Sequence, residues 1–252
     1  MPAGYAAAAG LLRERVILVT GAGDGLGRAA ALGCAAHGAT VVLLGRTVKK
    51  LEQVYDAIEA LEGAPKPAIY PMNLAGATWA EHEELAATVE RELGRLDGIV
   101  HCAAHFRAFM PLADETPRDW VEGLQVNLTA AYTLTRVCLP LLRRAPDASV
   151  VFLSDAAGRQ AKAYRGAFGV AKYAIEGLAR SWALELESTQ PNIRINTYDP
   201  GPLRTALRLR GYPGEEIASA PLPETAVPDL LYLLGPDSRG ISGAALARNS
   251  DP

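Results

Sequence analysis

The chain has 252 residues, of which 49% are hydrophobic and 21% are charged, and its net charge is −3. That length suits one α/β domain with a sizeable core, and the composition is typical of a soluble globular protein. The weak negative charge argues against an electrostatic nucleic-acid binder, and no apolar run is long enough to span a membrane. Three widely spaced cysteines, Cys34, Cys102 and Cys138, favour reduced thiols and a cytoplasmic location over a disulfide framework.

The N-terminal segment is rich in alanine but lacks the basic stretch that opens a signal peptide. We therefore expect a flexible tail over residues 1–13, followed by one domain over residues 14–252.

Short apolar, β-branched runs then alternate with long amphipathic stretches. The runs predict strands at residues 16–20, 40–44, 68–71, 98–101, 150–154 and 194–199. The stretches predict helices at residues 26–37, 48–61, 79–93, 120–144 and 165–187. This alternation predicts a doubly wound parallel sheet covered on both faces, which is the Rossmann type of α/β fold. Residues 207–223, rich in Pro and Gly, form the one long irregular stretch, and we favour a lid over a plain surface loop.

A glycine-rich turn, TGAGDGLGR at residues 20–28, joins the first strand to the first helix. Gly21 permits a tight turn, and Gly25 and Gly27 let the backbone approach a pyrophosphate and pack the helix on the sheet. The helix N-terminus offers free N–H groups and a positive dipole end to phosphates. The turn therefore predicts a dinucleotide site, with a turn kept only for packing as the alternative.

The second strand ends in LLGR, where an acidic residue would bind a free ribose 2′-hydroxyl. Arg46 stands there instead and can pair with a 2′-phosphate. The sequence thus favours NADP(H) over NAD(H), although Asp24 adds no second positive charge to the turn and Arg46 is otherwise a solvated loop arginine.

Together these features resemble the short-chain dehydrogenase/reductase family over essentially the whole chain, most closely its bacterial YciK-like branch. The spacing TGxxxGxG is the family's form, and Asn127, Lys172 and the segment PGPLRT at residues 200–205 match its later motifs. The resemblance implies a nicotinamide cofactor and oxidation or reduction of an alcohol–carbonyl pair. The cofactor contacts that it implies are Gly21, Gly23, Asp24, Gly25, Leu26, Gly27, Arg46, Asn73, Leu74, Cys102, Ala103, Lys172, Pro200, Gly201, Leu203 and Thr205.

Two catalytic positions depart from the family pattern. The resemblance implies a proton-donating tyrosine four residues before Lys172, an orienting serine thirteen residues before that, and a water-holding asparagine, matched by Asn127. The tyrosine position is Phe168 and the serine position is Asp155, whereas Ser154 next to it should point the other way. A phenyl ring cannot donate a proton, and general acid–base catalysis contributes roughly 10²–10⁴-fold. We therefore expect the standard activity to be weak or absent.

Other side chains could supply the proton. His105 follows the fourth strand and titrates near neutral pH, but an ordinary loop histidine is the simpler reading. Asp155 could carry a proton, although an ion pair with Lys172 is expected first. Tyr164 lies about 12 Å of helical rise from Lys172 and reaches the site only if its segment is a loop that folds inward, whereas Tyr173 faces elsewhere on the helix.

No metal site is predicted, because His101 and Cys102 have no further ligand at suitable spacing. The loops expected to face a substrate are mainly apolar and favour a small apolar ligand. Their side chains are Phe106, Phe109, Met110, Leu207 and Tyr212.

Three functional readings follow. The first is an NADP(H)-binding protein that serves as a sensor or as the silent member of an oligomer. The second is an active reductase whose acid is His105 or Asp155, and the third is a structural partner with an empty pocket. Family members associate through the helices matched by residues 120–144 and 165–187, so the resemblance implies a homo-oligomer (a dimer or tetramer) or a hetero-oligomer with an active relative.

Overall fold

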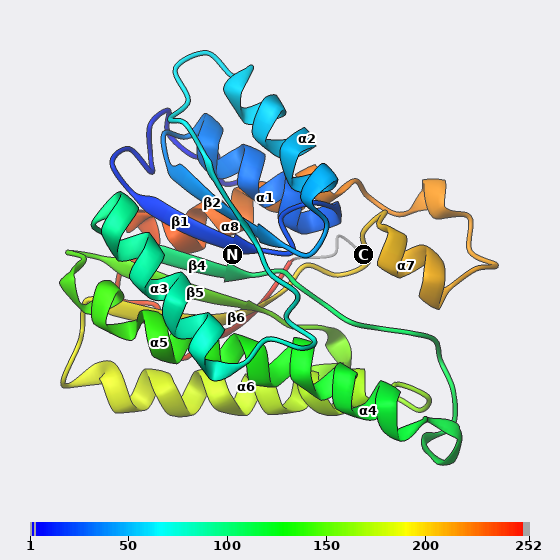
Figure 1. Ribbon diagram of the computed structural model, residues 1–252. Coiled ribbons are helices and arrows are strands. Elements are labelled where there is room, and N and C mark those ends of the chain that lie inside the picture. Colours follow the sequence, from blue (N-terminus) through cyan, green and yellow to red (C-terminus); the bar gives the residue numbers. More distant parts are fainter. Residues whose placement is uncertain (1, 3, 249–252) are drawn as a thin grey trace.

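The structure, a computed structural model, describes residue 2 and residues 4–248, and it forms one layered α/β domain (Figure 1). Within these residues seven parallel strands make one sheet in the order β3-β2-β1-β4-β5-β6-β7. The strands are β1 (Val16–Thr20), β2 (Thr40–Gly45), β3 (Ala68–Pro71), β4 (Gly98–His101), β5 (Ala148–Leu153), β6 (Ile193–Asp199) and β7 (Ala245–Ala247). The strand order reverses between β1 and β4, which confirms the doubly wound Rossmann fold.

Helices cover both faces of this sheet (Figure 1). They are α1 (Gly25–Ala36), α2 (Val48–Glu59), α3 (Trp79–Leu93), α4 (Pro117–Leu124), α5 (Ala130–Arg144), α6 (Gly166–Glu187), α7 (Ala206–Gly211) and α8 (Val227–Leu234). The core on one face joins α1, α2 and α8 to the sheet, and the core on the other joins α3, α5 and α6. Every residue of β1, β4 and β5 is buried, and each buried Val, Leu or Ile contributes about 1.5–3 kcal/mol.

The predicted strands and helices lie within a few residues of their expected bounds, with informative exceptions. The helix expected from residue 120 begins at Pro117, because Thr116 caps it by accepting the Asp119 N–H at 3.1 Å. It is then interrupted by the π-helical turn Gln125–Thr129 before α5. The stretch expected to be irregular contains α7, and neither α8 nor the short edge strand β7 was expected.

The N-terminal segment packs on the domain, contrary to the expected loose tail. Leu12 is fully buried, and the ring of Tyr5 lies 5.0 Å from that of Tyr232 on α8. The Tyr5 hydroxyl also donates to Asp237 at 2.7 Å. Apolar contact with α8 therefore ties this segment down; residues 1, 3 and 249–252 lie outside the described residues.

Parallel strands bring their carboxyl ends to one edge of the sheet, and the segments after β1, β4, β5 and β6 meet there. In Figure 1 this edge faces α4 and α7. Among the helices of the described residues, none has the length and apolar character needed to cross a bilayer.

Candidate functional site

The glycine-rich turn is shaped by close backbone contacts. Gly21 has φ +66, and a Cβ there would lie 2.9 Å from the Cα of Ala103. A Cβ on Gly27 would overlap the carbonyl oxygen of Gly21, and Gly25 has φ +50. Side chains at these positions would close the space in front of the N-terminus of α1, where a pyrophosphate is well bound. The turn therefore fits a dinucleotide.

Asp24 has no positive charge, but it binds a lysine beside the glycine-rich turn. Its carboxylate accepts the Gly25 N–H at 2.7 Å and pairs with Lys50 on α2 at 2.5 Å. The hydrogen bond from Lys50 is the main reason that the pKa of Asp24 is lowered. Lys50 was missed by the sequence reading; its only sequence signal is its place in the first turn of α2, four residues after Arg46.

Arg46 lies exposed at the carboxyl end of β2. Within the described part of the chain it has no carboxylate within 4.0 Å, so its guanidinium is free for a ligand. Gly23 and Leu26 belong to the same glycine-rich turn. A Cβ on Gly23 would lie 2.9 Å from the Cβ of Lys50. The end of β2 and the first turn of α2 thus each place one cationic side chain, Arg46 and Lys50, near the glycine-rich turn.

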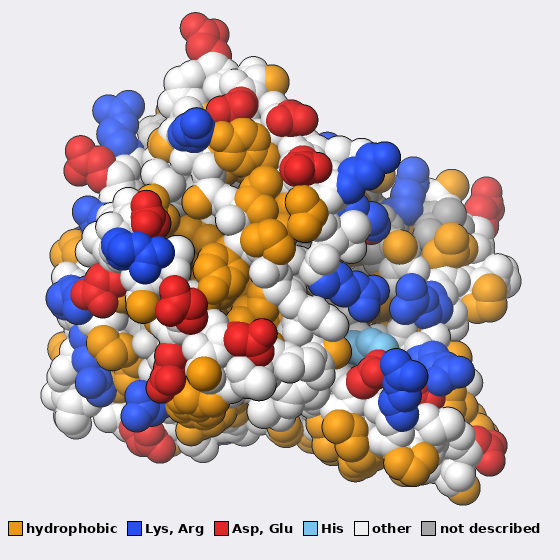
Figure 2. Space-filling view, in the orientation of Figure 1, with side chains coloured by type: hydrophobic (Ala, Val, Ile, Leu, Met, Phe, Trp, Pro, Cys, Tyr) orange, Lys and Arg blue, Asp and Glu red, His pale blue; other side chains and the backbone are white. Residues whose placement is uncertain are grey.

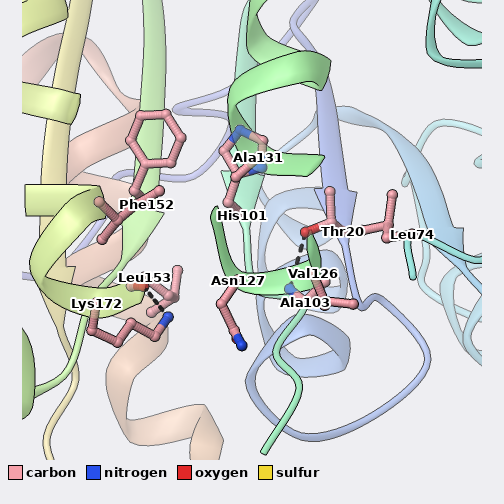
Figure 3. A pocket seen from close by; sticks show the side chains of 11 residues that line it. Thr20, Leu74, His101, Ala103, Val126, Asn127, Ala131, Phe152, Leu153 and Lys172 are labelled. Carbon is pink, nitrogen blue, oxygen red and sulfur yellow. Dashed lines mark hydrogen bonds between the residues drawn. The ribbon is translucent and has the colours of Figure 1, made fainter. Parts of the chain in front are cut away.

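The segments after β3 and β4 form the adjoining wall. Asn73 turns the chain after β3 by accepting the Ala75 N–H at 3.3 Å, and Leu74 is buried against the site. Ala103 donates its N–H to Thr20 Oγ1 at 3.0 Å, which joins the ends of β1 and β4 (Figure 3). Burial raises the pKa of the Cys102 thiol, so it stays protonated.

Lys172 stands at the centre of the predicted site. Its side chain is buried and donates to the carbonyl oxygen of Leu153 at 2.5 Å (Figure 3). Burial lowers the pKa of Lys172 to about 8, although the charges of Asp155 and Asp199 oppose that shift. A cavity of about 10 Å³, room for roughly one water, lies between Lys172, Asn127 and the ends of β4 and β5.

Asn127 holds the loop after β4 from within the π-helical turn. Its amide donates to the carbonyl oxygens of His105 and Gly123, both at 2.7 Å, and its oxygen accepts the His105 N–H at 3.0 Å. A π-helical turn widens the helix locally, and such turns are frequent at functional sites. Asn127 also lines the cavity together with Lys172, and its hydrogen bonds fix the backbone at His105.

Phe168 occupies the position one helical turn before Lys172. Its ring is buried, and its centroid lies 5.4 Å from the Lys172 Nζ and 5.4 Å from the ring of Phe106. Tyr164 does not replace it, because that side chain is 59% exposed on a residue with φ +66. Tyr173 is likewise exposed on the far side of α6.

Asp155 does not form the ion pair expected with Lys172. Its carboxylate instead accepts the Ala157 N–H at 2.8 Å and caps the short helical turn Ala156–Gly158. Capping a nearby N–H is a local interaction that competes with the longer reach to an amine. Ser154 donates to Glu176 at 2.5 Å, away from the cavity, as expected from the alternation of the strand.

The segment after β6 reaches the glycine-rich turn. Asp199 accepts the Gly201 N–H at 2.9 Å, which sets the turn after Pro200, and burial raises the pKa of Asp199. Leu203 is buried, and Thr205 caps α7 by accepting the Arg208 N–H at 3.1 Å. The methyl group of Thr205 lies 3.2 Å from where a Cβ on Gly25 would stand, so the predicted segments of both motifs meet.

Two histidines near the site have different surroundings. His101 shares a hydrogen bond of 2.8 Å with Thr135 and stacks on Phe152, and burial lowers its pKa to about 3. The Nε2 atom of His105 is buried and has no hydrogen-bond partner among the described residues. His105 does not line the cavity at Lys172. No group of three His, Cys, Asp or Glu side chains in the described part of the chain could hold a metal ion.

Comparison with known proteins places this geometry in a family. The family model described as short chain dehydrogenase matches residues 15–213. The chain is 39% identical to the oxidoreductase YciK of Escherichia coli (strain K12) over 233 residues, which cover 92% of this chain and 91% of that protein. The structure of a short chain dehydrogenase from Pseudomonas syringae has a TM-score of 0.94 and 47% identity, covering 96% of this chain and 98% of the other.

A third relative was solved with a ligand. It is a short chain dehydrogenase from Shigella flexneri 2a complexed with NADP, with a TM-score of 0.91, 37% identity, and coverage of 95% of this chain and 99% of the other. The family model spans most of the chain, and these relatives align over nearly all of it. Their likeness extends from the glycine-rich turn to Lys172, and the chain belongs to the short-chain dehydrogenase family.

Proposed function

We propose that this chain binds NADP(H) at the glycine-rich turn but lacks the proton donor of a standard dehydrogenase, so that its carbonyl reduction is weak or absent. The observation that carries the proposal is Phe168, which places a phenyl ring 5.4 Å from the Lys172 amine where the family has a tyrosine hydroxyl. Such a protein would act as a cofactor-dependent sensor or as the silent member of an oligomer.

The cofactor half of the proposal is supported by the fit of the turn. The backbone around Gly21, Gly25 and Gly27 would hold the pyrophosphate, and Arg46 with Lys50 would hold a 2′-phosphate. The solved relative complexed with NADP supports the same choice of cofactor. Thr205 and Lys172 would lie toward the nicotinamide end.

The catalytic half depends on where a proton can come from. Bound NADPH would supply a hydride to a substrate carbonyl, whose oxygen then needs a proton. Phe168 has none to give, and Asp155 is held by the Ala157 N–H. Lys172 holds its amine at the Leu153 carbonyl oxygen, which positions it to bind a ribose and leaves the substrate oxygen without a dedicated acid.

A second candidate function rests on His105. Its Nε2 is buried without a partner, and an orphaned polar atom often marks a group whose partner is a ligand. In this reading the chain is an active NADP(H)-dependent reductase with His105 as the acid, and His105→Ala abolishes its turnover. Asp155→Ala tests the other replacement acid in the same assay.

The test compares the wild type with Phe168→Tyr and with the double variant Phe168→Tyr, Asp155→Ser. Each is assayed for NADPH oxidation against one panel of aldehydes and ketones. We expect little turnover by the wild type and a gain of about 10²-fold or more in the double variant, because the new hydroxyl would stand beside Lys172. Phe168→Leu is the matched control, since it changes the ring without adding a proton donor.

The proposal is overturned if the wild type reduces members of the panel as fast as the double variant. Turnover that disappears in His105→Ala would establish the second candidate instead. NADPH binding that is absent in every variant would leave the structural partner with an empty pocket as the best description.

A further inference from the structure

An aromatic cluster closes the site on the side where a substrate would enter. Phe106 and Phe109 from the loop after β4 have ring centroids 4.9 Å apart, and Tyr212 from the end of α7 packs against Phe109 at 4.9 Å. Phe106 also contacts the edge of Phe168. Gly211 permits this approach, because a Cβ there would lie 3.1 Å from Phe106. The cluster therefore connects α7 to the ring beside Lys172.

Arginines from two elements converge on this cluster. Arg165, just before α6, places its guanidinium 4.4 Å from the Phe109 ring centroid and donates to the Tyr212 hydroxyl at 2.7 Å. Arg210 on α7 donates to the carbonyl oxygen of Phe106 at 3.0 Å. Arg208 stacks over Tyr212 at 3.7 Å. Arginine stacks on aromatic faces and also binds carboxylates and phosphates through two parallel hydrogen bonds.

The acidic side chains around the cluster are engaged elsewhere. Glu215 pairs with Arg208 at 2.6 Å, and Asp119 pairs with Arg107 at 2.5 Å. Glu115 accepts the Ala167 N–H at 2.9 Å. Arg165 and Arg210 have no carboxylate within 4.0 Å in the part of the chain that the structure describes.

The surface around the cluster accordingly carries an excess of positive charge. Figure 2 shows blue side chains around the hollow between the lobe of α7 and the lobe of α4, with few red ones between them. A positively lined cleft attracts anions and concentrates them at its mouth.

We infer that the ligand of this site is an apolar molecule with one anionic group, a carboxylate or a phosphate monoester, and that Arg165 and Arg210 bind that group. The inference deepens the proposed function, on which it rests, by naming the class of ligand that lies next to the cofactor. The aromatic cluster supplies the contact for the apolar part, and the chain Arg165–Phe109–Phe106–Phe168 leads from the anion site to Lys172.

Binding would exchange one partner of Arg165 for another. The Tyr212 hydroxyl is a neutral acceptor, and a hydrogen bond from a guanidinium to a carboxylate or phosphate is about twice as strong. The anion therefore displaces the Tyr212 hydroxyl from Arg165. In this way Tyr212 competes with the ligand for Arg165.

The test measures binding of three matched probes by calorimetry, each with and without saturating NADP⁺. The probes are 4-phenylbutyrate, 3-phenylpropyl phosphate and the neutral 4-phenylbutanamide. We expect one or both anions to bind at least about fivefold more tightly than the amide, because a guanidinium forms stronger hydrogen bonds to a charged acceptor than to a neutral one. The two anions together distinguish a carboxylate ligand from a phosphate ligand.

Three variants assign the effect. Arg165→Met should remove the preference for the anion while keeping an apolar stem on Phe109, and Arg180→Met, an exposed arginine on the same helix, should leave it unchanged. Tyr212→Phe keeps the stacking but removes the competing hydroxyl, so it should tighten anion binding by about twofold or more. A merely structural Arg165–Tyr212 contact would give no such gain.

The inference is overturned if the anions bind no better than the amide, or if Arg165→Met keeps the preference. Failure of NADP⁺ itself to bind is seen in a separate titration and contradicts the proposed function rather than the anion site.

Discussion

Phe168 lies beside Lys172 and differs from a proton-donating tyrosine by the absence of one hydroxyl group. Its ring faces the Lys172 amine at 5.4 Å, a distance at which a cation and a ring attract by about 0.5–1 kcal/mol or more. That attraction is small beside the burial of the amine, which lowers the pKa of Lys172 to about 8. The buried amine of Lys172 therefore lowers the free energy of unfolding, so its role is not to stabilise the fold.

The stability of Lys172→Met tests that statement. The pKa of Lys172 is about 8 when folded and about 10.4 when unfolded, so the unfolded chain binds more protons between these values. The destabilisation is thus full below pH 8 and fades as the pH rises toward 10.4. We expect Lys172→Met to raise the free energy of unfolding at pH 7 by about 1–3 kcal/mol, and by less at pH 9.5.

Urea unfolding at the two pH values measures this difference. Lys162→Met, an exposed lysine, is the control and should change little at either pH. A Lys172→Met variant that is less stable than the wild type at pH 7 would show that the amine stabilises the fold.

The residues of the site were predictable where the spacing along one element determines them. Phe168, Lys172 and Gly27 follow from positions in a single helix or turn. The contact between Asp24 and Lys50 was not predictable, because it joins residues 26 apart through the packing of α1 beside α2. Asp155 was assigned the wrong partner, since a nearby backbone N–H competed with Lys172.

Among the elements, the first turn of α2 places a lysine, Lys50, beside the glycine-rich turn, which has no positive side chain of its own before Arg28. Asp24 holds Lys50 beside the turn, and Arg46 lies at the end of β2, so two cations flank the expected position of a 2′-phosphate. Lys49 is the neighbour of Lys50 and is exposed without a carboxylate partner in the described residues. Lys49 is therefore a matched control for a substitution of Lys50.

We expect Lys50→Met to weaken NADPH binding by about fivefold to tenfold and to leave NADH binding nearly unchanged, because only NADPH carries the 2′-phosphate. Lys49→Met should alter neither affinity. Fluorescence titration of both cofactors measures the effect, and an equal loss for NADH would mean that Lys50 supports the fold of the turn instead.

The sequence predicted the bounds of some strands and helices more closely than those of others. The strands in the middle of the sheet are buried runs of Val, Ile and Leu, and their bounds were predicted closely. The π-helical turn has no signal in hydrophobic periodicity, and β7 spans only three residues at the sheet edge. α8 spans only eight residues and has Pro228 in its first turn, so its sequence contains few turns from which a helical period can be recognised.

At the scale of the molecule, α6 exposes an apolar stripe that a second subunit would cover. Val170, Tyr173 and Leu184 lie on one side of the helix, and Leu184 is 64% exposed. Gly177 lies on the same side with nothing within 4 Å of an added Cβ, which leaves room for a close helix. A surface of this kind is typical of an interface between copies.

We predict that the protein is a dimer or tetramer and that Tyr173→Glu with Leu184→Glu converts it to a monomer, because each charge would be buried unpaired in the interface. Sedimentation velocity measures the mass, and Val48→Glu, at an exposed site on α2, should keep the oligomer. A wild type that sediments as a monomer at tens of micromolar would rule out self-association through α6.

The protein is proposed to keep its dinucleotide site while it lacks a proton donor at Phe168, and calorimetric titration with NADPH and then NADH tests whether that site binds a cofactor. We predict saturable binding of one NADPH per chain, about tenfold or more tighter than that of NADH, since Arg46 and Lys50 meet a phosphate that NADH lacks. Equal affinities would contradict the assignment of these two cations. Absence of binding by both would show that the turn is kept for packing alone.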